Sequence, residues 1–196
     1  MSVICSTNRD TNLDHLLDQV AEQTYPQIEL LVLGHGVQLE PDFKERAAQR
    51  GITKVSVLHR EKDWSLGSCL NELVNASSGE IIAKFDDDDY YLPNYIHDQV
   101  NALINMNADL VGKAAHFIYF ENSNTLALRR PEQQHLWRNF VAGATLVGWK
   151  AVFEQIPFAD KRRGEDTEFL FQLEKSGFNV YSSCLLYTSP SPRDRG

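Results

Sequence analysis

The sequence has few cysteines, no long apolar run and no excess of positive charge. Its three cysteines, Cys5, Cys69 and Cys184, show neither the spacing of metal ligands nor that of a disulfide framework, which favours a reduced, intracellular setting. No apolar run approaches the roughly 20 residues of a membrane-spanning helix, and the N-terminus lacks a signal-peptide pattern. We therefore expect a cytoplasmic protein without a transmembrane segment, with the inner face of the membrane as the alternative location.

The sequence also has fewer basic than acidic residues. Lys and Arg number 19 against 27 for Asp and Glu, so the formal net charge is −8. A general nucleic-acid-binding protein needs a dominant basic face to neutralise phosphates, so we expect no nucleic-acid partner. An anionic substrate would need a local basic patch or a metal ion. The length of 196 residues and the hydrophobic content of 42% fit one globular domain with its own core.

The C-terminal tail differs in kind from the rest of the chain. The segment Cys184-Leu-Leu-Tyr-Thr-Ser-Pro-Ser-Pro-Arg-Asp194 resembles the translation of a transposase-type sequencing-library adapter, read in frame from a gene fragment. A natural tail rich in Ser and Pro is the alternative. On the first interpretation, residues 1–183 form the domain, the natural chain continues past Ser183, and residues 184–196 are a non-native tail.

Strand-like and helix-like segments alternate along the first part of the chain. Apolar runs typical of buried strands occur at 2–6, 28–33, 55–58 and 81–85, and helical periodicity occurs at 13–20, 41–50 and 67–76. Beyond them, the sequence predicts a helix with Pro93 in its first turn, a helix over 165–176, and strands over 109–120, 140–147 and 180–181. This alternation favours an α/β fold with a mostly parallel central sheet flanked by helices.

Polar segments follow three of the expected strands at the point where each strand ends. They are Thr7-Asn8-Arg9, Gly34-His35-Gly36 and Asp86–Asp89. Right-handed crossovers bring the carboxyl ends of parallel strands to one edge of the sheet, and ligands bind at that edge. We therefore expect these three segments to converge on one site.

Four consecutive aspartates, Asp86–Asp89, are the most unusual of these segments. Such a cluster repels itself, and a divalent cation offsets the repulsion, whereas a solvated acidic turn is the alternative. Oxygen ligands favour magnesium, manganese or calcium. An EF-hand is excluded, because Tyr91 stands where that loop needs Gly and His97 where it needs Glu. Neither a P-loop nor a Gly-x-Gly-x-x-Gly fingerprint occurs.

Several segments together resemble the glycosyltransferases of family 2, whose GT-A fold is Rossmann-like. Lys84-Phe-Asp-Asp-Asp-Asp-Tyr-Tyr-Leu-Pro-Asn94 is similar to the Asp-x-Asp region of that family, and residues 66–80 resemble the helix before it. The other similar segments are Ser2–Arg9, Gln23–Glu29, the acceptor-side strand Gly143-Ala-Thr-Leu-Val147 and the Glu-Asp helix at Arg163-Gly-Glu-Asp-Thr-Glu-Phe169. The resemblance covers residues 2–183 and depends on the order and spacing of these segments.

The resemblance implies the inverting transfer of a sugar from a nucleotide-diphosphate donor, most commonly a UDP-sugar, to an acceptor hydroxyl. It implies that Asp88 is the direct ligand of Mn²⁺ or Mg²⁺ and that Asp86 contacts the ribose or the metal. Asp89 would support the ligand Asp88 or the contact made by Asp86. Asp87 occupies the variable position, where its carboxylate is expected in solvent. The acceptor would be a glycan, a lipid-linked molecule or a small molecule, in a bacterial surface or secondary-metabolite pathway.

The resemblance also assigns the base to the expected helix at 165–176. Asp166 would accept the proton of the acceptor hydroxyl, with Glu165 as the second candidate. Both residues also suit the first turn of a helix for electrostatic reasons alone. Arg162 and Arg163 precede them and would close over the diphosphate, whereas a solvated charge run is the alternative.

Thr7, Asn8 and Arg9 correspond to the place where the family holds the nucleotide. A helix cap at Asn8 or Thr11 explains the same residues equally well. The chain departs from the family at Gly34-His35-Gly36, where many members have an Asp that reads the nucleobase. The histidine that often completes the metal site would lie beyond Ser183.

Three other functions compete with the transferase. A truncated or degenerate domain could bind metal and nucleotide, or support a larger protein, without turnover. A nucleotidyltransferase needs a Gly-rich basic loop, but Ser6–Asn12 has no Gly and a single Arg. A phosphoacceptor receiver domain needs acidic residues after its first strand, where this chain has Thr7-Asn8-Arg9.

Overall fold

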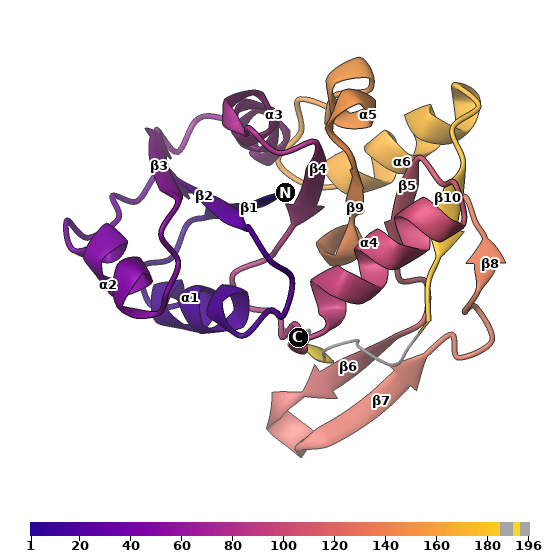
Figure 1. Ribbon diagram of the computed structural model, residues 1–196, viewed down its shortest axis with the longest axis horizontal. Helices are drawn as coiled ribbons and strands as arrows, with labels where there is room; N and C mark the ends of the chain where they lie inside the picture. Colours follow the sequence, from indigo (N-terminus) through magenta and orange to yellow (C-terminus); the bar gives the residue numbers. More distant parts are fainter. Residues whose placement is uncertain (185–189, 193–196) are drawn as a thin grey trace.

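The computed structural model describes residues 1–184 and 190–192, with no side chain described for Glu121 or 190–192. An eight-stranded sheet lies at its centre in the order β3-β2-β1-β4-β9-β5-β10-β8 (Figure 1). Its strands are β1 (Ser2–Thr7), β2 (Glu29–His35), β3 (Val55–Arg60), β4 (Ile81–Lys84), β5 (Leu110–Gly112), β8 (Leu136–Trp137), β9 (Val147–Trp149) and β10 (Val180–Ser182). The expected foreign tail, 184–196, lies for the most part outside the described residues.

The sheet is mostly parallel, as the sequence predicts. Parallel pairs join β3 to β2, β2 to β1, β1 to β4 and β5 to β10. Two strands run the other way: β9 is antiparallel to both β4 and β5 and lies between them, and β8 is antiparallel to β10. The insertion of β9 brings the residues before it beside the carboxyl end of β4.

Helices cover both faces of the sheet. They are α1 (Leu13–Ala21), α2 (Phe43–Gln49), α3 (Leu66–Ala76), α4 (Tyr95–Asn105), α5 (Lys150–Gln155) and α6 (Glu165–Lys175). Apolar residues of α1, α2 and α4 form one core with the sheet, and those of α3, α5 and α6 form the other. Neighbouring residues of β1 divide between these cores, Val3 into the first and Ile4 into the second, because successive strand side chains point to opposite faces. No helix in the described part of the chain is long and apolar enough to cross a membrane.

A second, smaller sheet projects beyond the first (Figure 1). Its strands β6 (His116–Phe120) and β7 (Thr125–Arg129) form an antiparallel hairpin, here called the β6–β7 hairpin, with a 3-10 turn at Glu121–Ser123. Strand β11 (Pro190–Pro192) pairs with β6 in parallel. After β7, the chain returns to the main sheet through β8.

The second half of the chain departs from the expected elements in several places. The apolar run at 109–120 is two strands in different sheets, β5 and β6, and most of 140–147 is irregular, with a 3-10 turn at Gly143–Thr145 before β9. Strands β7 and β8 and the short helix α5 were not expected. Pro93 precedes α4, whose N-cap is Asn94, so it lies outside the first turn. All the elements expected up to residue 90 are confirmed.

Candidate active site

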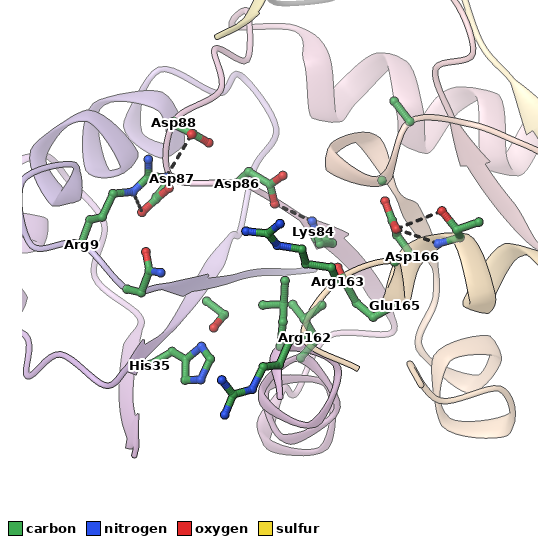
Figure 2. A pocket seen from close by; sticks show the side chains of 18 of the residues that line it. Arg9, His35, Lys84, Asp86, Asp87, Asp88, Arg162, Arg163, Glu165 and Asp166 are labelled. Atoms are coloured by element: carbon green, nitrogen blue, oxygen red, sulfur yellow. Dashed lines mark hydrogen bonds and ion pairs between the residues drawn. The ribbon is translucent and has the colours of Figure 1, made fainter. Parts of the chain in front are cut away.

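A cavity of about 1050 Å³ opens at the carboxyl ends of β1, β2 and β4 (Figure 2). All three polar segments that follow these strands contribute to its lining, so the expected convergence is confirmed. The contributing residues are Asn8, Arg9, His35, Gly36, Asp86, Asp87 and Asp88. Helix α1 has its N-cap at Asn12, so neither Asn8 nor Thr11 is that cap.

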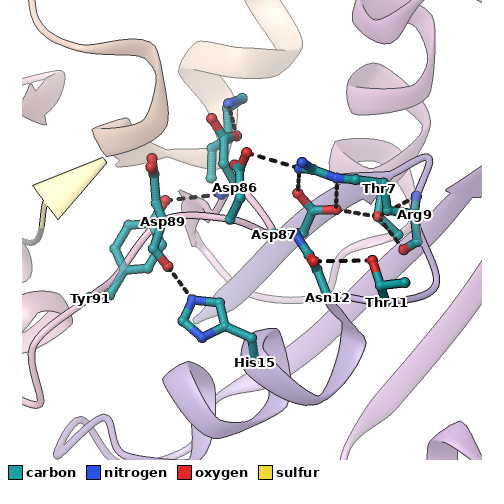
Figure 3. A network of polar contacts seen from close by, with 11 residues as sticks. Thr7, Arg9, Thr11, Asn12, His15, Asp86, Asp87, Asp89 and Tyr91 are labelled. Carbon is teal, nitrogen blue, oxygen red and sulfur yellow. Dashed lines mark hydrogen bonds and ion pairs between the residues drawn. The ribbon is translucent and has the colours of Figure 1, made fainter. Parts of the chain in front are cut away.

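The carboxylate of Asp87 is the most enclosed of the acidic groups at the cavity. Only 4% of the residue is exposed, and its oxygens accept hydrogen bonds from the Arg9 guanidinium and from the Thr7 hydroxyl (Figure 3). The expectation of a solvated Asp87 is therefore wrong, because β1 and β4 are neighbours and Arg9 reaches across to it. Thr7 is itself buried and supports Asp87, while Arg9 lines the cavity.

Asp86 and Asp88 are more open to the cavity. The side chain of Asp88 is 31% exposed and lies 3.0 Å from Nη2 of Arg9. Asp86 pairs with the ammonium of Lys84, which is buried at the end of β4. Burial alone lowers the pKa of Lys84, but the nearby carboxylates, Asp86 first, outweigh it and raise the pKa. Two protein cations therefore offset part of the charge of the acidic cluster.

Asp89 lies apart from this group. It is 4% exposed and is not part of the lining of the cavity. Its backbone oxygen is 2.8 Å from Nε2 of His15, on helix α1 (Figure 3). Of the three predicted metal ligands, Asp86 and Asp88 are the two that face the cavity.

The donor set at the cavity fits a hard divalent ion. Among the residues that the structure describes, no group of three or more His, Cys, Asp and Glu side chains is placed to hold a metal. Magnesium sites at nucleotides use one or two protein carboxylates, and phosphate and water supply the other ligands. Asp86 and Asp88 provide two carboxylates of this kind. The pair therefore suits an ion whose other ligands are phosphate or water oxygens.

The first turn of α6 faces the cavity from the other side, as Figure 2 shows. Its N-cap, Gly164, has a positive φ of 74°, a conformation that glycine adopts without strain. Asp166 lines the cavity, and its Oδ1 accepts a hydrogen bond of 2.7 Å from the backbone of Thr167. Its other oxygen lies against Gly143, where an added Cβ would come within 1.8 Å of Oδ2.

Glu165 is more enclosed than Asp166. It is 5% exposed, and burial raises its pKa, although the ammonium of Lys84 opposes that effect. Arg162 and Arg163, in the loop before α6, both line the cavity. Nη2 of Arg162 lies 3.5 Å from the backbone oxygen of Asp63.

Sequence reasoning missed several residues that line the cavity. Basic or imidazole side chains among them are Lys62, Lys84, His116 and Arg129. Lys84 ends a strand, so its position is a signal that the sequence contains. His116 and Arg129 belong to the β6–β7 hairpin, which was not expected as such.

The comparison with known families decides the classification. Residues 2–160 match the model described as "Glycosyl transferase family 2". The chain belongs to this family. Among curated proteins, it is 26% identical over 157 residues to an uncharacterized glycosyltransferase of Rickettsia typhi, covering 74% of this chain and 48% of that protein. It is 23% identical over 197 residues to the O-antigen biosynthesis glycosyltransferase WbnJ of Escherichia coli, and the match covers 95% of this chain and 78% of WbnJ. The chain thus spans about half the length of the rickettsial relative.

Solved structures show the same fold. The glycosyltransferase TarS of S. aureus, solved with UDP-GlcNAc, superposes with a TM-score of 0.75 at 17% identity, over 100% of this chain and 59% of that one. The mannosyltransferase PcManGT of Pyrobaculum calidifontis, solved with GDP-Man and Mn²⁺, gives a TM-score of 0.74 at 14% identity. The superposition covers 99% of this chain and 57% of that one. This family 2 domain therefore has the GT-A fold expected from its sequence.

Proposed function

We propose that this domain transfers a sugar, with inversion, from a nucleotide-diphosphate donor to an acceptor hydroxyl, using Mn²⁺ or Mg²⁺. One observation carries the proposal: Asp86 and Asp88 face the cavity from the end of β4, and Asp166 faces it from the opposite side (Figure 2). Inversion requires the acceptor to attack from the side opposite the leaving group. A base and a leaving-group site on opposite walls of one cavity meet that requirement.

The donor nucleotide would occupy the half of the cavity formed by the first four strands. Asn8, Arg9 and Asp86 would contact the nucleoside, with Thr7 acting through Asp87. Asp86 and Asp88 would hold the metal ion, which when bound supplies positive charge that stabilises the leaving diphosphate. We propose UDP as the nucleotide; TarS was solved with UDP-GlcNAc and the mannosyltransferase with GDP-Man, so both bases are to be tested.

The other half of the cavity would receive the acceptor. Asp166 would accept the proton of the hydroxyl, which requires hydrogen-bonding reach. Arg162 and Arg163 would add positive charge near the diphosphate. Glu165 is the second candidate for the base, but it is almost fully buried and adjoins Lys84. The acceptor would be a glycan, a lipid-linked molecule or a small molecule.

A domain that binds the donor without turnover is the second candidate function. The chain matches 48% of the rickettsial relative, and on this second proposal the residues that complete the reaction correspond to the part of that relative outside the match. We also propose that residues 184–196 are foreign to the domain and that the protein works in a bacterial cytoplasm or at the inner face of the membrane.

Calorimetric titration with UDP and with GDP, each in Mn²⁺ and then in EDTA, tests the proposal. We expect UDP to bind in Mn²⁺ and its affinity to fall sharply in EDTA. Absence of metal-dependent binding for both nucleotides would contradict the proposed donor site. Hydrolysis of a set of UDP-sugars, measured on the same sample, separates an active enzyme from a domain that only binds.

A further inference from the structure

The β6–β7 hairpin places two cationic or protonatable side chains together at the cavity. His116 is the first residue of β6 and Arg129 is the last of β7, and the two are direct partners across the antiparallel pair. Side chains of directly opposed residues stand on the same face of a two-stranded ribbon, close enough to act on one group. Both residues line the cavity.

The cavity as a whole is rich in positive charge, although the protein carries a net charge of −8. Its cationic lining residues are Arg9, Lys62, Lys84, Arg129, Arg162 and Arg163. Arg9 and Lys84 are already paired with aspartates of the acidic cluster. Arg129, in contrast, forms no ion pair with any residue in 1–184 or 190–192 whose side chain is described.

The start of the hairpin is linked to the Asp166 side of the cavity, because the backbone of Ala142 donates a 2.9 Å hydrogen bond to the backbone oxygen of Lys113, three residues before His116. The chain that returns from the hairpin supplies Phe140, Ala142 and Gly143 to the lining, and Gly143 touches the carboxylate of Asp166. The acidic residues described in the lining come from the end of β4 and the start of α6, and none of them is among the hairpin side chains that the structure describes. His116 and Arg129 therefore form a basic part of the lining, which Ala142 and Gly143 connect to the side that holds Asp166.

We propose that His116 and Arg129 bind a phosphate group of the acceptor, near the hydroxyl that receives the sugar. This inference rests on the proposed function. An arginine offers two parallel N–H donors and an imidazole offers a third, and this set matches the oxygens of a phosphate. The site would accept a phosphorylated alcohol, either free in solution or as the headgroup of a lipid.

The test uses the full chain saturated with UDP and Mn²⁺, so that the donor site is occupied first. Glycerol 1-phosphate is titrated into it by calorimetry, and uncharged glycerol serves as the matched ligand. We expect glycerol 1-phosphate alone to bind, and Arg129→Ala to weaken it by about tenfold or more, because a charge-assisted hydrogen bond is lost. Arg129→Gln, which keeps more of the side chain but removes its charge, should also lower the affinity for glycerol 1-phosphate.

Lys44→Ala is the control, because Lys44 is an exposed cation on α2 and does not line the cavity. It should change the affinity for glycerol 1-phosphate by less than about twofold, as expected of a surface charge. A second arm replaces glycerol 1-phosphate with phosphatidylcholine vesicles that contain phosphatidylglycerol. Arg129-dependent binding in the soluble arm or in the vesicle arm supports the inference and identifies the source of the phosphate.

Four results would overturn the inference. If UDP binds but neither phosphate probe does, or if Arg129→Ala leaves the affinity of the probes unchanged, the phosphate site is refuted while the proposed donor site stands. If Arg129→Ala weakens UDP as much as it weakens the probes, Arg129 belongs to the donor site. If the wild-type chain fails to bind UDP, the proposed function and the inference fail together.

Discussion

The carboxylate of Asp166 rests against the backbone of Gly143, so closely that a Cβ atom at position 143 would stand 1.8 Å from Oδ2. These residues are far apart in the sequence, and the position of the carboxylate depends on the absence of a side chain at 143. Gly143 begins the 3-10 turn before β9 and needs no positive φ, so its requirement for glycine is one of space.

We predict that Gly143→Ala displaces Asp166 and lowers kcat by about a hundredfold, the usual effect of moving a reacting group by about 1 Å. The three nearest atoms to an added Cβ all belong to the Asp166 side chain, which can rotate away, so the fold and the affinity for UDP should be retained. Steady-state kinetics measures kcat, calorimetry measures the affinity for UDP, and thermal melting tests whether the fold is retained. If Gly143 acts through Asp166, adding Gly143→Ala to Asp166→Asn costs nothing further; additive losses would contradict this relationship.

Adjacent aspartates in the acidic cluster should have separable effects. Asp88→Asn removes a proposed metal ligand that is 31% exposed, so we expect UDP affinity in Mn²⁺ to fall to the level seen in EDTA while the melting temperature holds. Asp87→Asn weakens the buried contacts to Arg9 and Thr7, so we expect a loss of about 1–3 kcal/mol in the free energy of unfolding. Calorimetry and urea denaturation on both variants provide the comparison. Equal effects of the two substitutions on UDP affinity would argue against the assignment of Asp88.

Asp166→Asn and Glu165→Gln distinguish the two candidates for the base. The first should retain UDP binding and lower transfer or hydrolysis by about a hundredfold or more, because general base catalysis contributes about that much. The second should lower activity by less, because Glu165 is buried beside Lys84. The measurements are kcat for each variant and UDP affinity as the control for folding. An active Asp166→Asn with an inactive Glu165→Gln would transfer the role to Glu165.

Glu29 should make stability depend on pH. It is 7% exposed, and although burial raises its pKa, contacts from Lys54, Ser2 and Ser78 outweigh that and lower the pKa from 4.5 to about 2. Its ionised form therefore stabilises the fold above about pH 4.5, and this contribution is lost as the pH falls towards 2. We predict that Glu29→Gln lowers the free energy of unfolding by about 2–3 kcal/mol at neutral pH.

Urea denaturation at neutral and acidic pH measures this effect. The difference between wild type and Glu29→Gln should shrink as the pH is lowered from 4.5 towards 2. Glu22→Gln, a change at an exposed residue at the end of α1, is the matched control and should show no such trend. A difference that is constant with pH would mean that packing, and not ionisation, is lost in the Glu29 variant.

The first half of the fold could be predicted because its signals are strong and local. Strands β1, β2 and β4 are continuous apolar runs, and α1 has a clear apolar stripe. The second half depends on long-range placement. Strand β9 has three residues, including Gly148, and pairs with two strands that lie far away in the sequence. No periodicity can develop in so short a segment.

The site also combines features that the local sequence predicts with features that depend on long-range placement. The convergence of the segments after β1, β2 and β4 follows from parallel strands, which the alternation of elements already predicts. The side-chain directions do not follow from it. That Asp87 turns inward to Arg9 while Asp88 stays open depends on the turn geometry after β4. Likewise the pairing of His116 with Arg129 requires the register of a hairpin that the sequence does not reveal.

The residues just before β9 connect the two walls of the cavity. The backbone oxygen of Leu146 accepts a 2.9 Å hydrogen bond from the backbone of Lys84, and that of Ala144 accepts one of 2.8 Å from the Tyr91 hydroxyl. Gly143, in the same turn, supports Asp166. Redesign of the backbone of this turn, unlike the single change Gly143→Ala, would therefore alter donor affinity and turnover together. To change the acceptor, a protein engineer would keep this turn and vary the β6–β7 hairpin, which belongs to a separate sheet and projects from the central one (Figure 1).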